Sequence, residues 1–314
     1  MINLEAETRC GYLITTEMKS VWNVQLQLLQ KLLDVCGKYN LKIWADSGTL
    51  IGTIRHKGYI PWDDDIDMIM MRDDYDKLIS VCQDEFKDPY FLQTAYSEKA
   101  PYSHGHAQLR MNGTTGLLGN NIFMNIHLGI FIDIFVLDNV PEDNNEIRKM
   151  ALSIMKFQSP LILRMQNKII ISKNIALLLK NILYRFMPIR IFKRRYKKME
   201  NFAKTYADSA SKYVSPILLS QTPDFLMRCK LRKEWFSDTI LLPFEDIMMP
   251  VPKGYHDILT HEYGDYMTPV KAPTMHGGFL AIDPDKDYTQ YIPKLRRQAR
   301  KHFINKLLNK NNSQ

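Results

Sequence analysis

Apolar residues in the first 40 positions recur at the spacing of one helical face. Thr15 or Thr16 can cap this helix, Gly37 lies near its end, and the helix runs to about Tyr39. We expect it to cover one face of a sheet. The residues on its apolar face are Met18, Val21, Trp22, Leu28, Leu29, Leu32, Leu33 and Cys36.

Short apolar stretches bounded by turn residues follow this helix and predict strands. They lie at 41–45, 65–71, 90–94, 105–111 and 129–136. A turn with a short helix at 47–55 separates the first two of these strands. A helix from Asp73 or Asp74 to Phe86 separates the second strand from the third. This order predicts an α+β fold, with a mixed sheet flanked by helices.

The pattern becomes helical and basic from Pro141 to about Ser220 and predicts an insertion or a second lobe. Beyond it, residues 235–251 predict a hairpin around 243–246, and residues 252–254 begin a short helix that ends at Gly264. We therefore divide the chain into a catalytic core (1–140), a basic helical insertion (141–220), the C-terminal part of the catalytic domain (221–290) and a basic, partly disordered tail (291–314).

The net charge of +8 is unevenly distributed. Eleven Lys or Arg lie in 161–198 and seven in 294–310, two segments without any acid, so the rest of the chain carries a net charge of −10. Four scattered cysteines form no zinc or disulfide pattern, and a reducing compartment fits. The N-terminus does not resemble a secretory signal, and the uncharged stretch 111–132 is too rich in Gly and Asn for a membrane span.

The segment 161–198 alternates its cations with large apolar residues. Peripheral contact with the anionic inner face of a membrane explains this pattern, and so does a pair of helices packed on the core with a solvated basic face. Nucleic acid is the less favoured partner because no recognised binding module accompanies the charge. We expect a cytoplasmic protein, whether or not it touches the membrane.

Four carboxylates occupy five positions in residues 63–67, directly before an apolar run. Like charges this close resist ionising together unless a cation lies between them. If a strand begins here, Asp65 and Asp67 share one face and can bind one metal ion. Asp63 and Asp64 are then supporting charges. A solvated acidic loop is the alternative for the run taken alone.

Two further features support a metal-dependent phosphoryl-transfer site. Ser47, Gly48 and Thr49 form a turn between a predicted strand and a helix, where backbone N–H groups can bind a phosphate. Asp133 interrupts an otherwise apolar strand and needs a partner, either the same metal or hydrogen-bond donors. Arg55, Lys57 and Arg110 are candidate phosphate ligands, with surface solvation as the alternative for Lys57.

The stretch 48–67, GTLIGTIRHKGYIPWDDDID, resembles the signature of the LicD family of phosphotransferases, which is related to fukutin and fukutin-related protein. Residues 129–135 (GIFIDIF), 110–114 (RMNGT), 250–254 (PVPKG) and 263–267 (YGDYM) extend the resemblance over roughly 25–280. Family membership implies a nucleotidyltransferase-like fold and transfer of a substituted phosphate, typically phosphocholine from CDP-choline, to a surface-glycan hydroxyl. The turn departs from the wider nucleotidyltransferase superfamily, because Ser47 precedes Gly48 instead of following it.

On this interpretation Asp65, Asp67 and Asp133 are catalytic and hold Mg²⁺ or Mn²⁺, and Asp133 either completes the metal shell or accepts the proton of the acceptor. The acceptor is a precursor of teichoic acid, capsule or lipopolysaccharide, expected to be lipid-linked, and CMP leaves. Three alternatives stay open: nucleotidyl transfer, an Asp-x-Asp glycosyltransferase, and a noncatalytic membrane-associated scaffold. The tyrosines at 255, 263 and 266 suit a quaternary-ammonium pocket or a plain core, and we interpret the histidines as structural.

Overall fold

A computed structural model of the chain describes residues 2–119, 121–165, 174–207, 210–219, 222–271 and 278–311. Among the described residues, seven strands form a mixed central sheet. Along its main path they run in the order β10 (Leu231–Arg232), β9 (Tyr213–Ser215), β8 (Phe131–Val140), β4 (Asp67–Met71) and β3 (Trp44–Ala45). Strand β6 (Ala107–Met111) pairs with β8 and with β5 (Tyr90–Gln93).

Strand β8 is the centre of this sheet because it pairs with three others. Its pairing with β4 is parallel, whereas those with β6 and β9 are antiparallel. The predicted mixed sheet is therefore confirmed. β4 begins two residues later than predicted, at Asp67, and Asp133 N donates to the carbonyl of Ile66 at 2.9 Å.

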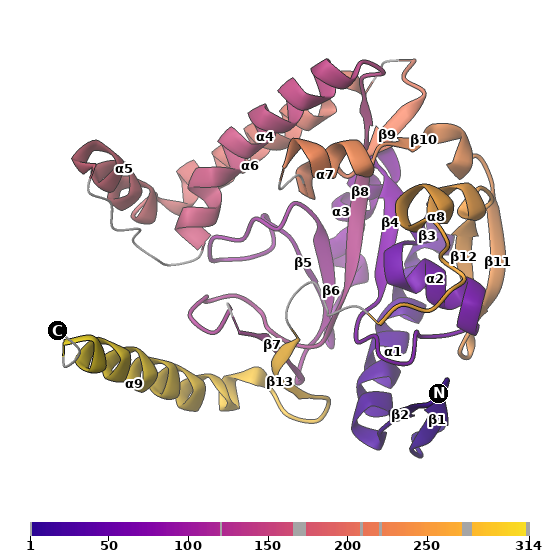
Figure 1. Cartoon of the computed structure of the whole chain (residues 1–314), viewed down its shortest axis with the longest axis horizontal. Coiled ribbons are helices and arrows are strands. Elements are labelled where there is room, and N and C mark those ends of the chain that lie inside the picture. The colour runs from indigo at the N-terminus through magenta and orange to yellow at the C-terminus, as the bar shows by residue number, and fades with distance from the viewer. Residues whose placement is uncertain are drawn as a thin grey trace.

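Helix α1 (Thr16–Lys38) packs against β6 and β8, as predicted (Figure 1). The Thr15 hydroxyl caps it by accepting from Met18 N at 3.2 Å, and apolar residues of one face, among them Trp22, Leu29 and Leu32, are buried. α3 (Arg72–Glu85) contacts β4 and β8. Burial of these two apolar faces accounts for much of the main core.

A second group of elements packs around α2 (Ser47–His56). The predicted hairpin is present as β11 (Thr239–Phe244) and β12 (Ile247–Pro252), and the predicted short helix as α8 (Tyr255–Tyr263), ended by Gly264 at a φ of 67°. β11 and α8 contact α2, and β12 contacts β3. The chain after residue 220 thus returns to the first hundred residues.

The segment after β8 is helical, as the pattern predicts. It contains α4 (Asn144–Met165), α5 (Ile175–Arg185), α6 (Ile189–Ala203) and α7 (Pro223–Arg228), and Figure 1 shows α5 at the end of an arm directed away from the sheet. α4 packs on α6 and α7. Within the predicted insertion, however, β9 joins the central sheet and Phe192 lies in the main core, so this range is joined to the core.

Two small antiparallel sheets lie outside the central sheet. The hairpin of β1 (Glu7–Arg9) and β2 (Tyr12–Ile14) precedes α1, and β7 (Thr115–Leu118) pairs with β13 (Phe279–Asp283). The helix α9 (Ile292–Asn311) occupies most of the predicted tail. Single-turn 3-10 helices span Lys204–Tyr206, Ile217–Leu219, Lys233–Phe236 and Tyr288–Gln290. In the described part of the chain, no helix is both long and apolar enough to cross a membrane.

Candidate active site

The parallel pairing of β4 and β8 brings two of the predicted catalytic residues together. Asp67 and Asp133 are directly opposite in the register, at the beginning of β4 and near the beginning of β8. Opposed residues on neighbouring strands point to the same face of a sheet. The two carboxylates, 66 residues apart in sequence, therefore lie side by side.

The acidic loop before β4 is fixed by helix α1. Trp22 Nε1 donates to the carbonyl of Asp63 at 3.2 Å, and Gln25 Nε2 donates to that of Asp64 at 2.7 Å. The Trp22 ring stacks on Tyr59, with the ring centroids 4.3 Å apart. Because both donors are buried and come from one rigid helix, the backbone of this loop has a defined position beside Asp67.

The carboxylates of Asp63, Asp64 and Asp65 offer oxygen atoms that all lie within 4.8 Å of one another. Burial raises the pKa of Asp63 to about 8, with Asp65 and Asp64 adding to the effect. The pKa of Asp67 is well above its usual range, chiefly because of burial and then because of the charges of Asp65 and Asp133. The carboxylates of Asp63, Asp64, Asp65, Asp67 and Asp133 fit a divalent cation, whose charge would remove their mutual repulsion.

The predicted supporting charges lie next to one of the predicted ligands. We expected Asp65, Asp67 and Asp133 as the metal ligands and Asp63 and Asp64 as supporting charges. Asp63 and Asp64 are grouped with Asp65, and Asp63 also contributes to the raised pKa of Asp67. We therefore add Asp63 to the candidate ligands, and the assignment of Asp65, Asp67 and Asp133 stays a prediction.

The first turn of α2 lies against the acidic loop. A methyl group added to Gly48 would lie 2.6 Å from Oδ2 of Asp63, so only glycine allows this approach without a shift. Ser47 has a φ of 47°, and its hydroxyl donates to Oδ2 of Asp46 at 3.2 Å. The Thr49 hydroxyl is buried and accepts from Asp67 N at 2.9 Å. Thr49 thus holds α2 against β4, and the proposed phosphate contacts of all three stay predictions.

The three predicted phosphate ligands occupy different environments. Arg110 is 1% exposed, and its guanidinium donates to Gln93, to Gln108 and to the carbonyl of Gly129, which makes it a core residue in this arrangement. Arg55 is half-buried and donates to the carbonyl of Tyr266 at 2.7 Å. Lys57 is exposed at the end of α2. We do not carry Arg110 into the proposed site.

Sequence reasoning missed two polar partners of Asp133. His106 Nε2 lies 2.8 Å and Gln108 Nε2 2.7 Å from the same oxygen, Oδ1. Burial raises the pKa of Asp133, but these contacts outweigh burial and lower it below the usual value. The alternation of His106 and Gln108 along a predicted strand was the signal, because it places both on the face that carries Asp133.

Two more buried acids that the sequence did not indicate are Glu262 on helix α8 and Asp46 at the N-cap of α2. Burial raises the pKa of Glu262 to about 8, with a further contribution from Asp46, and burial raises that of Asp46 to about 6. We call Asp46, Asp63, Asp64, Asp65, Asp67, Asp133 and Glu262 the carboxylate site.

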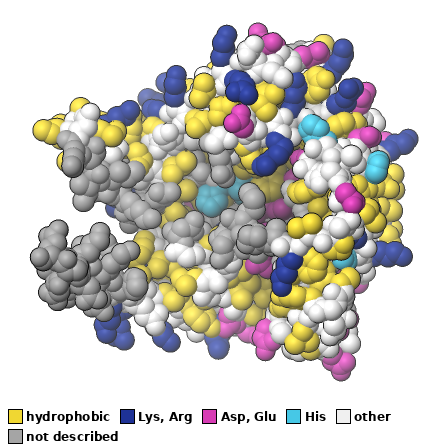
Figure 2. All heavy atoms as spheres, viewed as in Figure 1, with side chains coloured by type: hydrophobic (Ala, Val, Ile, Leu, Met, Phe, Trp, Pro, Cys, Tyr) yellow, Lys and Arg dark blue, Asp and Glu magenta, His cyan; other side chains and the backbone are white. Residues whose placement is uncertain are grey.

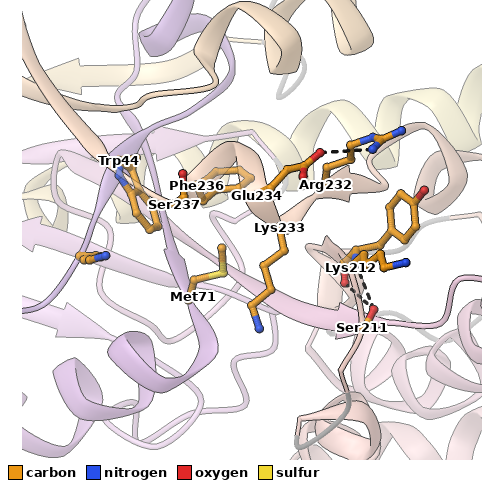
Figure 3. A pocket seen from close by; sticks show the side chains of 11 residues that line it. Trp44, Met71, Ser211, Lys212, Arg232, Lys233, Glu234, Phe236 and Ser237 are labelled. Carbon is orange, nitrogen blue, oxygen red and sulfur yellow. Dashed lines mark hydrogen bonds and ion pairs between the residues drawn. The ribbon is translucent and has the colours of Figure 1, made fainter.

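A cavity of about 470 Å³ lies at the other end of β4, around Met71 (Figure 3). Lys42, Lys212 and Lys233 line it, and Arg232 is paired there with Glu234 at 3.2 Å. Met71 is four residues beyond Asp67, about 13 Å along an extended strand. This basic cavity is therefore separate from the carboxylate site.

Comparison with known proteins identifies the family. Residues 40–124, which hold the turn and the acidic loop, match the family model described as "LicD/FKTN/FKRP, nucleotidyltransferase domain". Over 248 residues the chain is 32% identical to the lipopolysaccharide cholinephosphotransferase LicD of Haemophilus influenzae, with 78% of this chain and 89% of that protein covered. The chain belongs to the LicD family.

A shorter match adds a relative from another genus. An uncharacterized protein of Rickettsia prowazekii is 38% identical over 71 residues, which cover 23% of this chain and 24% of that protein. The resemblance stated from the motifs is thus confirmed. The nucleotidyltransferase description comes from the matched family model, while the structure itself establishes the mixed sheet with its flanking helices.

Proposed function

We propose that this LicD-family enzyme transfers phosphocholine from CDP-choline to a hydroxyl of a cell-surface glycan precursor and releases CMP. The observation that carries the proposal is the pairing of Asp67 with Asp133 beside the acidic loop, in a chain 32% identical to a lipopolysaccharide cholinephosphotransferase. Lipopolysaccharide, teichoic acid and capsule precursors are the candidate acceptors.

Asp65, Asp67 and Asp133, together with Asp63, would hold Mg²⁺ or Mn²⁺. The cation would neutralise charge on the donor phosphates and on the departing CMP. Oδ1 of Asp133 already accepts from His106 and Gln108. Its second oxygen therefore serves either as a ligand or as the acceptor of the proton from the glycan hydroxyl.

In the reaction, the glycan oxygen attacks the phosphorus that carries choline. The new O–P bond forms as the P–O bond to CMP breaks, and the hydroxyl proton leaves with Asp133 or with solvent. The first turn of α2 presents backbone N–H groups from Ser47 onward, where a donor phosphate is favoured. Arg55 and Lys57, in the last turn and at the C-cap of α2, are further candidate phosphate ligands.

Residues 174–199, which comprise helix α5, the residues that follow it and most of helix α6, form what we call the basic arm. This range holds eight Lys or Arg and no acid. Ile175, Leu179, Leu183 and Phe186 are each at least 60% exposed, and hydrophobic side chains are visible at the tip of the arm in Figure 2. We propose peripheral contact between this arm and an anionic membrane on its cytoplasmic face, where a lipid-linked acceptor is reached. Residues 166–173 of the originally predicted segment lie outside the described residues.

The direct experiment incubates the protein with CDP-choline, CDP-ethanolamine, CDP-glycerol or CDP-ribitol and Mg²⁺, with and without membrane-linked oligosaccharide, and measures CMP. We expect acceptor-dependent CMP release with CDP-choline, its loss in Asp67→Asn, and its retention in Asp84→Asn, an exposed carboxylate on α3. Pyrophosphate release from CTP would instead indicate nucleotidyl transfer. If wild type and Asp67→Asn behave alike with every donor, the proposal fails.

A further inference from the structure

A cavity of about 620 Å³ lies next to the carboxylate site, between the first turns of α1, strand β2, the acidic loop and strand β13. Aromatic rings line it, among them Tyr12, Trp62 and the edge of the buried Trp22. The Tyr12 and Trp62 rings meet at 68°, with their centroids 6.2 Å apart. This is an edge-to-face pair, and both of its rings line the cavity.

The lining of this cavity is also acidic. Among the described lining residues, Glu17, Asp64, Asp283 and Asp285 contribute carboxylates and Lys286 contributes a cation, while Lys271 lies close by over the Tyr12 ring. Hydrogen bonds with its own backbone N–H and with Thr15 lower the pKa of Glu17, so this group is ionised at neutral pH. Aromatic faces together with negative charge attract a cation that is too weakly hydrated to prefer water.

The face of Tyr12 already carries a cation in this structure. Lys271 Nζ lies 4.7 Å from the centroid of the ring. Tyr213, far away on β9, has a comparable contact with Lys230 Nζ at 4.1 Å. The second contact offers a matched control, because both tyrosines lie on three-residue strands and both hold an ammonium over the ring.

Two residues connect the cavity to the carboxylate site. Asp64 lines the cavity, and one of its oxygen atoms lies within 4.8 Å of ligand atoms of Asp63 and Asp65. Trp22 also lines the cavity and donates to the carbonyl of Asp63. The cavity and the carboxylate site therefore meet at Asp64, so a phosphate bound at the carboxylates would have this cavity beside it.

We propose that this cavity binds the quaternary ammonium group of the donor alcohol, with Tyr12 and Trp62 as ring contacts and the surrounding carboxylates as counter-charge. The inference rests on the proposed function for its role in catalysis, but binding of the ammonium group can be measured alone. It places the ammonium site on β2, α1 and β13, not at the predicted tyrosines of 255–266.

The test titrates choline chloride, and in parallel its neutral carbon isostere 3,3-dimethylbutan-1-ol, while tryptophan fluorescence is recorded. We expect wild type to bind choline more tightly than the neutral alcohol.

Tyr12→Leu should weaken choline binding about three- to thirty-fold and Tyr12→Phe much less, as expected from loss of one ring contact. Tyr213→Leu should have no effect. Asp285→Asn, an exposed change, should weaken choline more than the isostere.

Equal choline affinity in wild type and Tyr12→Leu, or equal binding of choline and its isostere by wild type, would overturn the ammonium site. The companion measurement is the KM for CDP-choline, which should rise in Tyr12→Leu with little change in kcat. Tyr12-dependent choline binding without CMP release from CDP-choline would refute the transfer proposal alone. CMP release with an unchanged KM in Tyr12→Leu would refute the ammonium site alone.

Discussion

The carboxylate site and the basic arm differ in charge and in how they are held. Each acid of the site lies on or beside an element of the sheet or its packed helices, with partners such as Trp22, Gln25 and His106. The basic arm instead presents bulky apolar side chains to solvent at its tip, between cations. The difference agrees with the two proposals, in which one region holds a cation in fixed geometry and the other contacts a membrane surface.

The largest effect should come from removing one carboxylate of the site. Asp67→Asn keeps the shape of the side chain but removes a charge from the cation that the site is proposed to hold. We expect acceptor-dependent CMP release to fall at least about a hundredfold. The loss of a metal ligand should weaken metal affinity by more than the substitution of a residue that only orients a ligand. Initial rates at a Mg²⁺ concentration that only just saturates the wild type test this. A variant within threefold of wild type would exclude Asp67 as a ligand.

Changing the basic arm should affect membrane binding and leave the site intact. Leu179→Glu with Leu183→Glu places two acids among exposed apolar residues. We expect at least about tenfold weaker sedimentation with vesicles that contain anionic lipid, since apolar insertion and headgroup attraction are both reduced. Turnover of a soluble acceptor analogue should be unchanged.

The matched control for the arm is Leu241→Glu, an exposed leucine on β11. This change should leave vesicle binding at the wild-type level. If all variants sediment alike, or if wild type ignores anionic vesicles, the basic arm is a solvated face of a helical pair. Concentration-dependent self-association of wild type that the arm variant abolishes would likewise contradict membrane contact.

Gly48 tests whether the turn and the acidic loop form one site. Gly48→Ala should displace the Asp63 carboxylate, because the new methyl group would lie 2.6 Å from its Oδ2. We expect Mg²⁺ affinity, measured by calorimetry, to fall about tenfold, as when a group that orients a ligand is changed. Helical propensity favours alanine by about 1 kcal/mol, so the free energy of unfolding should not fall by much.

Gly37→Ala is the control for this substitution. Gly37 is also helical, and a methyl group there would meet no atom within 4 Å. It should gain stability and keep full Mg²⁺ affinity. Unchanged affinity in both alanine variants would show that Asp63 is not a ligand.

A further expected effect is the pH dependence of metal binding. The raised pKa of Asp63, about 8, means that a cation must displace a proton below that pH. Affinity for Mg²⁺ should therefore fall by up to about tenfold per pH unit below 8, with proton release measurable by calorimetry in two buffers. Proton uptake, or affinity independent of pH between 6 and 8, would contradict this.

The same shift predicts a stability effect with a definite sign. A carboxyl whose pKa is higher in the folded than in the unfolded state stabilises the fold at low pH, and this contribution is lost as pH rises through the folded value. In the absence of a divalent cation, the free energy of unfolding should decrease between pH 6 and 8. Asp63→Asn should remove much of that decrease, and Mg²⁺ should offset it in wild type.

The sequence was sufficient for the elements that have strong periodicity or turn signals. The apolar face of α1 and its Thr15 cap, the hairpin of β11 and β12, and the strands that carry Asp67 and Asp133 were all predicted. Each depends on residues close together in the chain, and local spacing and turn chemistry describe these adequately. The motif around residues 48–67 supplied the family.

What the sequence could not provide depends on contacts between distant segments. The parallel register that places Asp67 opposite Asp133 requires the three-dimensional sheet. Arg110 was predicted as a phosphate ligand, yet its guanidinium donates hydrogen bonds in the core to Gln93, Gln108 and a backbone carbonyl. Glu262 reaches Asp46 only because α8 packs on α2, more than 200 residues away along the chain.

The most direct test of the central claim follows both halves of the donor. CDP-choline labelled with one isotope in choline and another in cytidine is incubated with the protein, Mg²⁺ and membrane-linked oligosaccharide. The account predicts choline label in the glycan, cytidine label in CMP, and neither product with Asp67→Asn. Cytidine label in the glycan, or choline label transferred equally by wild type and Asp67→Asn, would contradict it.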